Sequence, residues 1–150
     1  NSASIGTRAY QMALFVVFES GLQMLADNPT LYYNNEDCIK FISSVPVLWD
    51  ETKVLDAKLG EHLVLAKRNA DKWYLGGMTA ERKEPLEMDV VLDFLPEGKT
   101  YKLTSFEDGS NADRQAMHYT KNVREVRKGD TVKIRMVRNG GYAASLEASL

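Results

Sequence analysis

The sequence is poor in the residues that build disulfides and metal centres. It has one cysteine, Cys38, and two histidines, His62 and His118, in 150 residues. A single cysteine excludes an internal disulfide and a cluster of metal-binding thiolates. Two histidines this far apart in sequence do not form a typical zinc-ligand pattern. We expect Cys38 to be a buried structural thiol and both histidines to serve packing or surface roles.

Long apolar runs and a strong charge imbalance are also missing. No stretch of about 20 apolar residues is present, so we expect no membrane-spanning helix and no membrane partner. The formal net charge is -2, and Glu125 and Asp130 interrupt the basic residues between positions 121 and 138. Because nucleic-acid binding requires a concentrated positive face, we expect no nucleic-acid partner. The chain begins with Asn1 instead of Met, and we expect the native N-terminus to lie upstream.

The first part of the sequence has the pattern of a helix over residues 8–27. Thr7, or Ser4 one turn earlier, is a suitable N-cap, and Pro29 ends the pattern because the residue before a proline is disfavoured in helical geometry. Residues 12–18, MALFVVF, would be apolar on all sides of this helix. A helix of that kind is normally buried in a large protein. The pattern therefore predicts that the helix packs against a sheet or against a second copy, and that the chain is part of something longer.

A second helix is predicted for residues 36–44, before Pro46. From Trp49 onward apolar residues recur with a period of two, which indicates strands, and turn residues separate them at regular spacing. The predicted strands cover residues 51–57, 61–68, 72–79, 86–92, 101–107, 119–126, 131–137 and 142–146. This pattern predicts a mainly β protein, an antiparallel β-sandwich of Greek-key type preceded by one or two helices.

The residues around Trp49 form the most distinctive motif. Residues 45–55, VPVLWDETKVL, connect the helical part to the first predicted strand. Further motifs are LGE at 59–61, AKR at 66–68, WYLGGMT at 73–79, LDFL at 92–95 and GGYAA at 140–144, with GTR at 6–8, QMAL at 11–14 and residues 17–26 upstream. This set resembles glycoside hydrolase family 97, the α-glucosidase and α-galactosidase family of gut-type bacteria, over nearly the whole chain. The resemblance implies that the chain is the C-terminal piece of a larger enzyme.

By this resemblance, residues 1–45 are the end of a catalytic (β/α)8 barrel, chiefly its last helix, and residues 46–150 are a C-terminal antiparallel β-sandwich. The intact enzyme would hydrolyse α-glucosidic or α-galactosidic bonds of an oligosaccharide and bind calcium in its barrel. The family's catalytic carboxylates and calcium-binding glutamates lie upstream of Gly6. The resemblance therefore assigns no catalytic, cofactor-binding or metal-binding residue to this chain. It leaves glucoside or galactoside, and inversion or retention, open.

The resemblance also implies a role and a location. The piece would be structural and inactive by itself, with the rest of the barrel as its partner and a homo-oligomer through the exposed helix as a further option. The enzyme would be periplasmic or associated with the cell envelope of a Bacteroides-type bacterium. The alternative is a free-standing carbohydrate-binding or interaction sandwich, against which the wholly apolar residues 12–18 argue.

Acidic residues of the β region do not form an evident catalytic pair. The candidates are Asp50, Glu51, Asp56, Asp89, Asp93, Glu107 and Asp108. Hydrolysis of a glycosidic bond requires two carboxyl groups that face each other, about 5 to 9 Å apart. Asp50 and Glu51 are adjacent, and neighbouring side chains on a strand point to opposite faces. We expect these two to join a hydrogen-bond network at the junction of helices and strands.

Aromatic residues offer a test of the alternative. A sugar-binding module would expose aromatic platforms, and the candidates are Trp49, Trp73, Tyr74, Tyr101, Phe106, Tyr119 and Tyr142. We expect most of them to be core residues, and Trp49 to be mostly buried with its indole N–H hydrogen-bonded. Gly76 and Gly77 within a strand indicate a bulge or a close backbone approach. Residues 108–113 superficially resemble a calcium loop but lack the glutamate and the flanking helices of an EF-hand.

Overall fold

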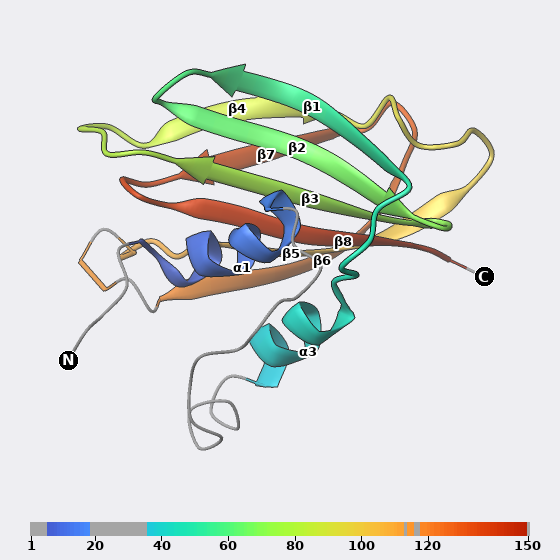
Figure 1. Cartoon of the computed structure of the whole chain (residues 1–150), viewed down its shortest axis with the longest axis horizontal. Helices are drawn as coiled ribbons and strands as arrows, with labels where there is room; N and C mark the ends of the chain where they lie inside the picture. The colour runs from blue at the N-terminus through green and yellow to red at the C-terminus, as the bar shows by residue number, and fades with distance from the viewer. Residues whose placement is uncertain (1–5, 19–35, 113, 116–117, 150) are drawn as a thin grey trace.

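The computed structural model describes residues 6–18, 36–112, 114–115 and 118–149. Within these ranges it contains two helices and eight strands (Figure 1). The helices are α1 Arg8–Val17 and α3 Glu36–Ser44, and the strands are β1 Glu51–Lys58, β2 His62–Asn69, β3 Lys72–Thr79, β4 Leu86–Val91, β5 Thr100–Asp108, β6 Tyr119–Arg127, β7 Thr131–Met136 and β8 Gly141–Ala148. The strand bounds agree closely with those predicted from the period-two pattern. The bounds of α3 and β3 are the same as those predicted for the second helix and the third strand.

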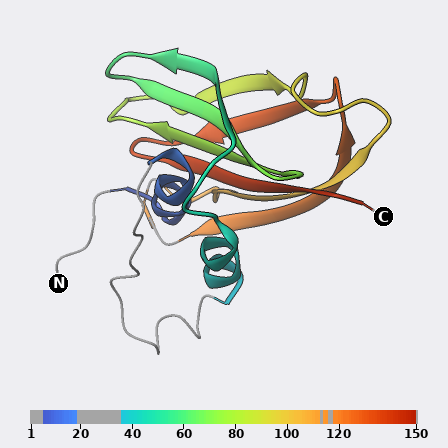
Figure 2. The ribbon, with the colours of Figure 1, turned by 45° about the vertical axis from the view of Figure 1, so that its right-hand side comes forward.

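The described strands form two antiparallel sheets. The larger sheet has the order β1-β2-β3-β8-β5-β6, and the smaller sheet pairs β4 with β7. Strand β8 lies between β3 and β5, so the last strand of the chain occupies the centre of the larger sheet. Figures 1 and 2 show the smaller sheet on one side of the larger sheet and the two helices on the other. The predicted mainly β, antiparallel fold is confirmed.

The inner core lies between the two sheets. Alternate residues of each strand point inward, so one face of each strand supplies the apolar side chains of this inner core. The larger sheet contributes Val64, Ala66, Trp73, Leu75, Tyr101, Leu103, Val126, Tyr142, Ala144 and Leu146, and the smaller sheet contributes Val90, Val132, Ile134 and Met136. This core packs the two sheets face to face as a sandwich.

A second core lies between the other face of the larger sheet and the helices. Met12, Ala13 and Val16 of α1 and Cys38 and Phe41 of α3 are buried there. The sheet supplies Leu65, Tyr74, Phe106 and Ala143. The predicted packing of the first helix on the sheet is thereby confirmed. The division of the parent protein into a barrel ending near residue 45 and a sandwich after it stays a prediction.

Helix α1 ends earlier than predicted. Phe18 has extended backbone angles (φ -83°, ψ 137°) and is 58% exposed, so the prediction of a helix apolar on all sides through Phe18 is wrong at that residue. The Lys67 ammonium donates to the carbonyl of Val17 at 3.1 Å, which satisfies a terminal carbonyl and places a cation at the negative end of the helix. The rest of the predicted helix, residues 19–27, lies outside the described residues. No described helix is long and apolar enough to cross a membrane.

Candidate functional site

A buried carboxylate joins α1 to one end of the larger sheet. Asp108, at the end of β5, is 8% exposed. Its Oδ1 accepts a hydrogen bond from the Thr7 hydroxyl at 2.5 Å. Its Oδ2 accepts from the backbone N–H groups of Val137 at 2.9 Å and Gly141 at 3.2 Å. Thr7 also caps α1 as predicted, because its hydroxyl oxygen accepts from the N–H of Tyr10 at 3.1 Å.

The surroundings of Asp108 fit a structural role, in which the carboxylate connects the start of α1 to the sheet. Burial raises the pKa of its carboxyl, although the hydrogen bonds from Thr7, Val137 and Gly141 oppose the shift. Both carboxylate oxygens already accept bonds from these groups. The carboxylate therefore holds the first residue before α1 against the turn between β7 and β8.

Glycines allow α1 to lie directly on the sheet. A Cβ added at Gly141 of β8 would lie 2.6 Å from the backbone nitrogen of Tyr10. One added at Gly76 of β3 would lie 3.0 Å from a methyl group of Val17. The close backbone approach predicted from Gly76 and Gly77 is confirmed at Gly76, where the helix passes over the strand.

Aromatic rings fill the seam between α3 and the sheet. Trp49 packs edge-on against Tyr74 with ring centroids 5.4 Å apart, and the Tyr74 hydroxyl donates to the carbonyl of Ser44 at 2.7 Å. The Lys67 ammonium lies 5.4 Å from the Trp49 ring, a cation–π distance. Trp49 is partly buried, so the prediction of a mostly buried ring is met only in part. The predicted indole hydrogen bond is wrong for the described residues, among which the buried Nε1 has no partner.

Cys38 is buried in the same layer, as predicted for a structural thiol. Burial raises the pKa of its thiol. The pKa of Tyr119 is raised to about 12, chiefly by burial and also by a hydrogen bond with Cys38. A thiol of raised pKa is mostly protonated at neutral pH and is a poor nucleophile. This thiol therefore fits a packing role.

Asp50 and Glu51 meet at one arginine. The Arg68 guanidinium lies 3.8 Å from the Asp50 carboxylate and 3.3 Å from the Glu51 carboxylate. Asp50 precedes β1 and also accepts from the N–H of Ala70 at 2.7 Å. The prediction that the two side chains point to opposite faces is wrong, because strand alternation begins only at Glu51. The predicted hydrogen-bond network at the junction is confirmed.

The remaining acids are dispersed. Asp56 lies 3.4 Å from His62, and Glu107 accepts from Asn122 at 2.6 Å and from Ser105 at 3.0 Å. Asp89 on β4 and Asp93 beyond its end are exposed. No set of three or more acidic, histidine or cysteine side chains suited to a metal ion occurs in the described part of the chain. Asp113, the last residue of the calcium-like loop, lies outside it.

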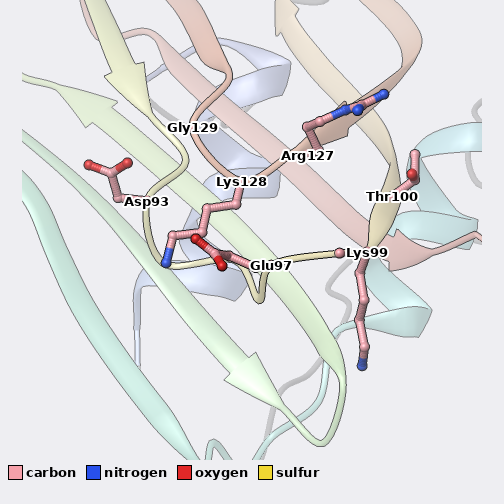
Figure 3. Close-up of a pocket in the computed structure, with 8 residues that line it drawn as sticks. Asp93, Glu97, Lys99, Thr100, Arg127, Lys128 and Gly129 are labelled. Atoms are coloured by element: carbon pink, nitrogen blue, oxygen red, sulfur yellow. The ribbon is translucent and has the colours of Figure 1, made fainter.

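The candidate sugar platforms are covered. Trp73, Tyr74, Tyr101, Phe106 and Tyr142 are each at most 3% exposed, and Trp49 and Tyr119 are partly buried. A shallow hollow of about 560 Å³ lies where the turns before β5 and after β6 meet. In Figure 3 its charged side chains, among them Asp93, Lys99 and Arg127, extend in different directions instead of converging. Neither feature provides the flat aromatic surface that a sugar ring would stack on.

Comparison with known proteins identifies the family. The family model described as "Glycosyl-hydrolase 97 C-terminal, oligomerisation" matches residues 48–147. The chain belongs to this family. The matched segment begins at the Trp49 seam and covers both sheets. The resemblance drawn from the motif around Trp49 is thereby confirmed, and the matching model describes the C-terminal domain of the family and associates it with oligomerisation.

Relatives of this family 97 domain are similar over almost its whole length. A protein named "Retaining alpha-galactosidase" from Bacteroides thetaiotaomicron is 40% identical over 96% of the chain, and a "Probable retaining alpha-galactosidase" from Streptomyces bingchenggensis is 31% identical over 91%. A family 97 enzyme from Pseudoalteromonas sp. strain K8, solved with panose, superposes with a TM-score of 0.91 at 32% identity over 97% of the chain. The chain spans 21%, 20% and 23% of these proteins, respectively.

Sequence reasoning missed the polar contacts that dock α1. Thr7 and Asp108 are 101 positions apart, and no local pattern links a helix cap to a strand end so distant. Lys67 is 1% exposed, although lysine is rarely buried. The sequence did contain a hint of this burial. Lys67 directly follows the apolar residues 63–66, and strand alternation places its side chain on the same face as Leu63 and Leu65.

Proposed function

We propose that the parent protein is a retaining α-galactosidase and that this domain contributes assembly and not chemistry. The observation that carries the proposal is the 40% identity with a retaining α-galactosidase over 96% of the chain. The family 97 enzyme solved with panose is less similar, at 32% identity. The same domain thus accompanies more than one specificity, and the closer similarity favours the galactoside.

The non-catalytic role is supported by the hydrogen bonds and ion pairs that the acidic side chains already make. Glu51 and Asp50 are held by Arg68, Asp108 is enclosed by three donors, and Glu107 is held by Asn122 and Ser105. A hydrolase needs two carboxyl groups that are open to the same glycosidic oxygen. Engaged carboxylates of this kind support a structural domain.

The test compares the intact parent enzyme with the 150-residue chain on 4-nitrophenyl α-galactoside and α-glucoside. We expect the parent to prefer the galactoside and the isolated chain to release no nitrophenol from either. NMR of the first-formed sugar should show the α-anomer if the configuration is retained. A parent that prefers the glucoside, or a β-anomer as first product, would overturn the substrate or the stereochemical part. Turnover by the chain that disappears in Glu51→Gln would overturn the structural role.

Calcium binding and export are further parts of this proposal. The described residues offer no cluster for a metal, so a calcium site would belong to the catalytic part of the parent enzyme. Chelation should then abolish parent activity and leave the thermal melt of the 150-residue chain unchanged. We also propose that the parent is exported to the periplasm or cell envelope. Fractionation of the source bacterium tests this, and activity confined to the cytoplasmic fraction would contradict it.

A further inference from the structure

Among the described strands, β1 lies at one edge of the larger sheet (Figure 1). It pairs with β2 on one side, and an edge strand leaves its outer row of N–H and C=O groups open for pairing with another strand. Six of its eight residues are exposed. Val54, in the middle of the strand, is 62% exposed. Lysines and a bulge on an edge strand disfavour indiscriminate pairing, so a partner strand has to match this edge in both register and charge.

A bulge brings the charges of β1 onto one face. The register with β2 shifts between Val54 and Asp56, and an extra residue at that point reverses the alternation beyond it. Glu51, Lys53, Asp56 and Lys58 consequently lie opposite Arg68, Ala66, Val64 and His62. These β2 residues alternate along their strand and share a face. Along β1, this face therefore carries negative, positive, negative and positive charges in turn.

This order of charges is complementary to itself. If a second copy placed its β1 antiparallel beside the first, with a two-fold axis between Val54 and Leu55, Lys53 would face Asp56 of the second copy. Glu51 would face Lys58 of the second copy. Glu51, Lys53, Asp56 and Lys58 are 39%, 45%, 53% and 65% exposed, respectively. Within the chain Glu51 contacts Lys53 at 3.5 Å and Lys58 contacts Glu61 at 3.2 Å, so the second copy would add charge partners to side chains that already make exposed ion pairs.

Neighbouring registers lose this match. A shift of two residues in one direction sets Lys53 opposite Lys58, and a shift in the other direction sets Glu51 opposite Asp56. Like charges directly opposite each other across two strands are destabilising, and opposite charges are stabilising. The bulge and the charge order together select one symmetric register.

We propose that two copies of this domain associate edge to edge through β1 in that register and form one continuous sheet. The inference rests on the proposed assembly role and adds to it the strand, the symmetry and the register. The contact is isologous, because the same strand serves both copies, and main-chain hydrogen bonds add a strand to each sheet. Val54 lies on the opposite face from the charges and would be shielded beside the axis.

Charge exchange tests the register. In Lys53→Glu, an acid faces Asp56 of the second copy at two symmetric places, and in Asp56→Lys a base faces Lys53 twice. Each single variant should raise the dimer dissociation constant about tenfold or more, since each cross-strand pair is disrupted twice. The double variant Lys53→Glu/Asp56→Lys restores opposite charges and should return to within about threefold of the wild type. Arg127→Glu, on the opposite edge strand β6, is the matched control and should not alter dissociation.

Sedimentation of the 150-residue chain and of the intact enzyme gives the readout, and thermal melts report whether each variant folds. Association that no β1 variant weakens would overturn the β1 interface and leave an assembly role through another surface. Weakening without restoration in the double variant would overturn the register. If the wild-type chain and intact enzyme are both monomeric, the proposed assembly role fails as well. A monomeric intact enzyme that protects β1 from hydrogen exchange would show that its catalytic part covers this edge.

Discussion

Gly141→Ala tests how α1 is docked. The added Cβ would lie 2.6 Å from the backbone nitrogen of Tyr10, well inside the 3.5 to 4.0 Å at which carbon atoms normally meet. The obstacle is backbone, so no side chain can rotate away, and α1 must retreat by about 1 Å. The variant therefore strains the buried contact between helix and sheet.

The expected loss of stability in Gly141→Ala can be estimated from the contacts that α1 makes with the sheet. Overpacking a close contact costs about 1 to 3 kcal/mol. Full release of the helix would expose Met12 and Val16, which are 0% exposed, at about 1.5 to 3 kcal/mol each. We expect a loss of about 3 kcal/mol, because a rigid neighbour puts the cost at the upper end of the overpacking range. For a domain of this size that lowers the melting temperature by about 6 to 12 °C.

Gly77→Ala is the matched control. Gly77 lies on the adjacent strand β3, opposite Tyr142, and an added Cβ would meet the flexible Met136 sulfur at 3.2 Å. We expect a change within about 1 kcal/mol, because a glycine within a strand is itself unfavourable by a similar amount. Hydrogen exchange should show lost protection of α1 amides in Gly141→Ala alone. Equal melts for Gly141→Ala and the wild type would refute the close approach of helix and sheet.

Three other substitutions address the same layer. Trp49→Ala should lower the free energy of unfolding by about 2 to 3 kcal/mol, below the usual range for a fully buried tryptophan. A glucan pull-down should recover neither the variant nor the wild type. An unchanged melting temperature with lost glucan binding would favour a sugar-binding module. Tyr74→Phe removes the 2.7 Å bond to the Ser44 carbonyl and should cost about 1 kcal/mol in a melt; an unchanged melting temperature would contradict that bond. Asp108→Asn removes an acid whose pKa is raised in the folded state by burial, so the stability of the wild type relative to this variant should increase as the pH falls toward the unfolded value and decrease as the pH rises. Melts between pH 4 and 8 check the sign, and a relative stability that increases with pH would contradict it.

The β part of the fold was predictable because its signal is local. In β2 and β3, alternate residues face the two cores, and glycine- or asparagine-containing turns separate the strands. The end of α1 was not predictable, since the sequence continues with apolar residues beyond Val17. The contact found at this end, from Lys67 to the Val17 carbonyl, joins residues fifty positions apart.

The site could be anticipated in part. The network of Asp50, Glu51 and Arg68 could be predicted from the position of two acids at a junction. That both acids lie on the same side of the chain could not be predicted, because strand alternation starts only at Glu51. The position of Trp49 at the seam was predictable, but its partial exposure and the lack of a partner for Nε1 among the described residues were not. Hydrogen-bond geometry depends on the orientation of a ring between two layers, which no sequence pattern records.

The molar mass of the 150-residue chain in solution tests the central claim, that this domain contributes assembly to its parent enzyme. Light scattering over a wide range of concentrations should give a mass that rises toward twice the 16.9 kDa of one chain. A mass that stays at 16.9 kDa at every concentration, together with an intact enzyme that is also monomeric, would contradict it.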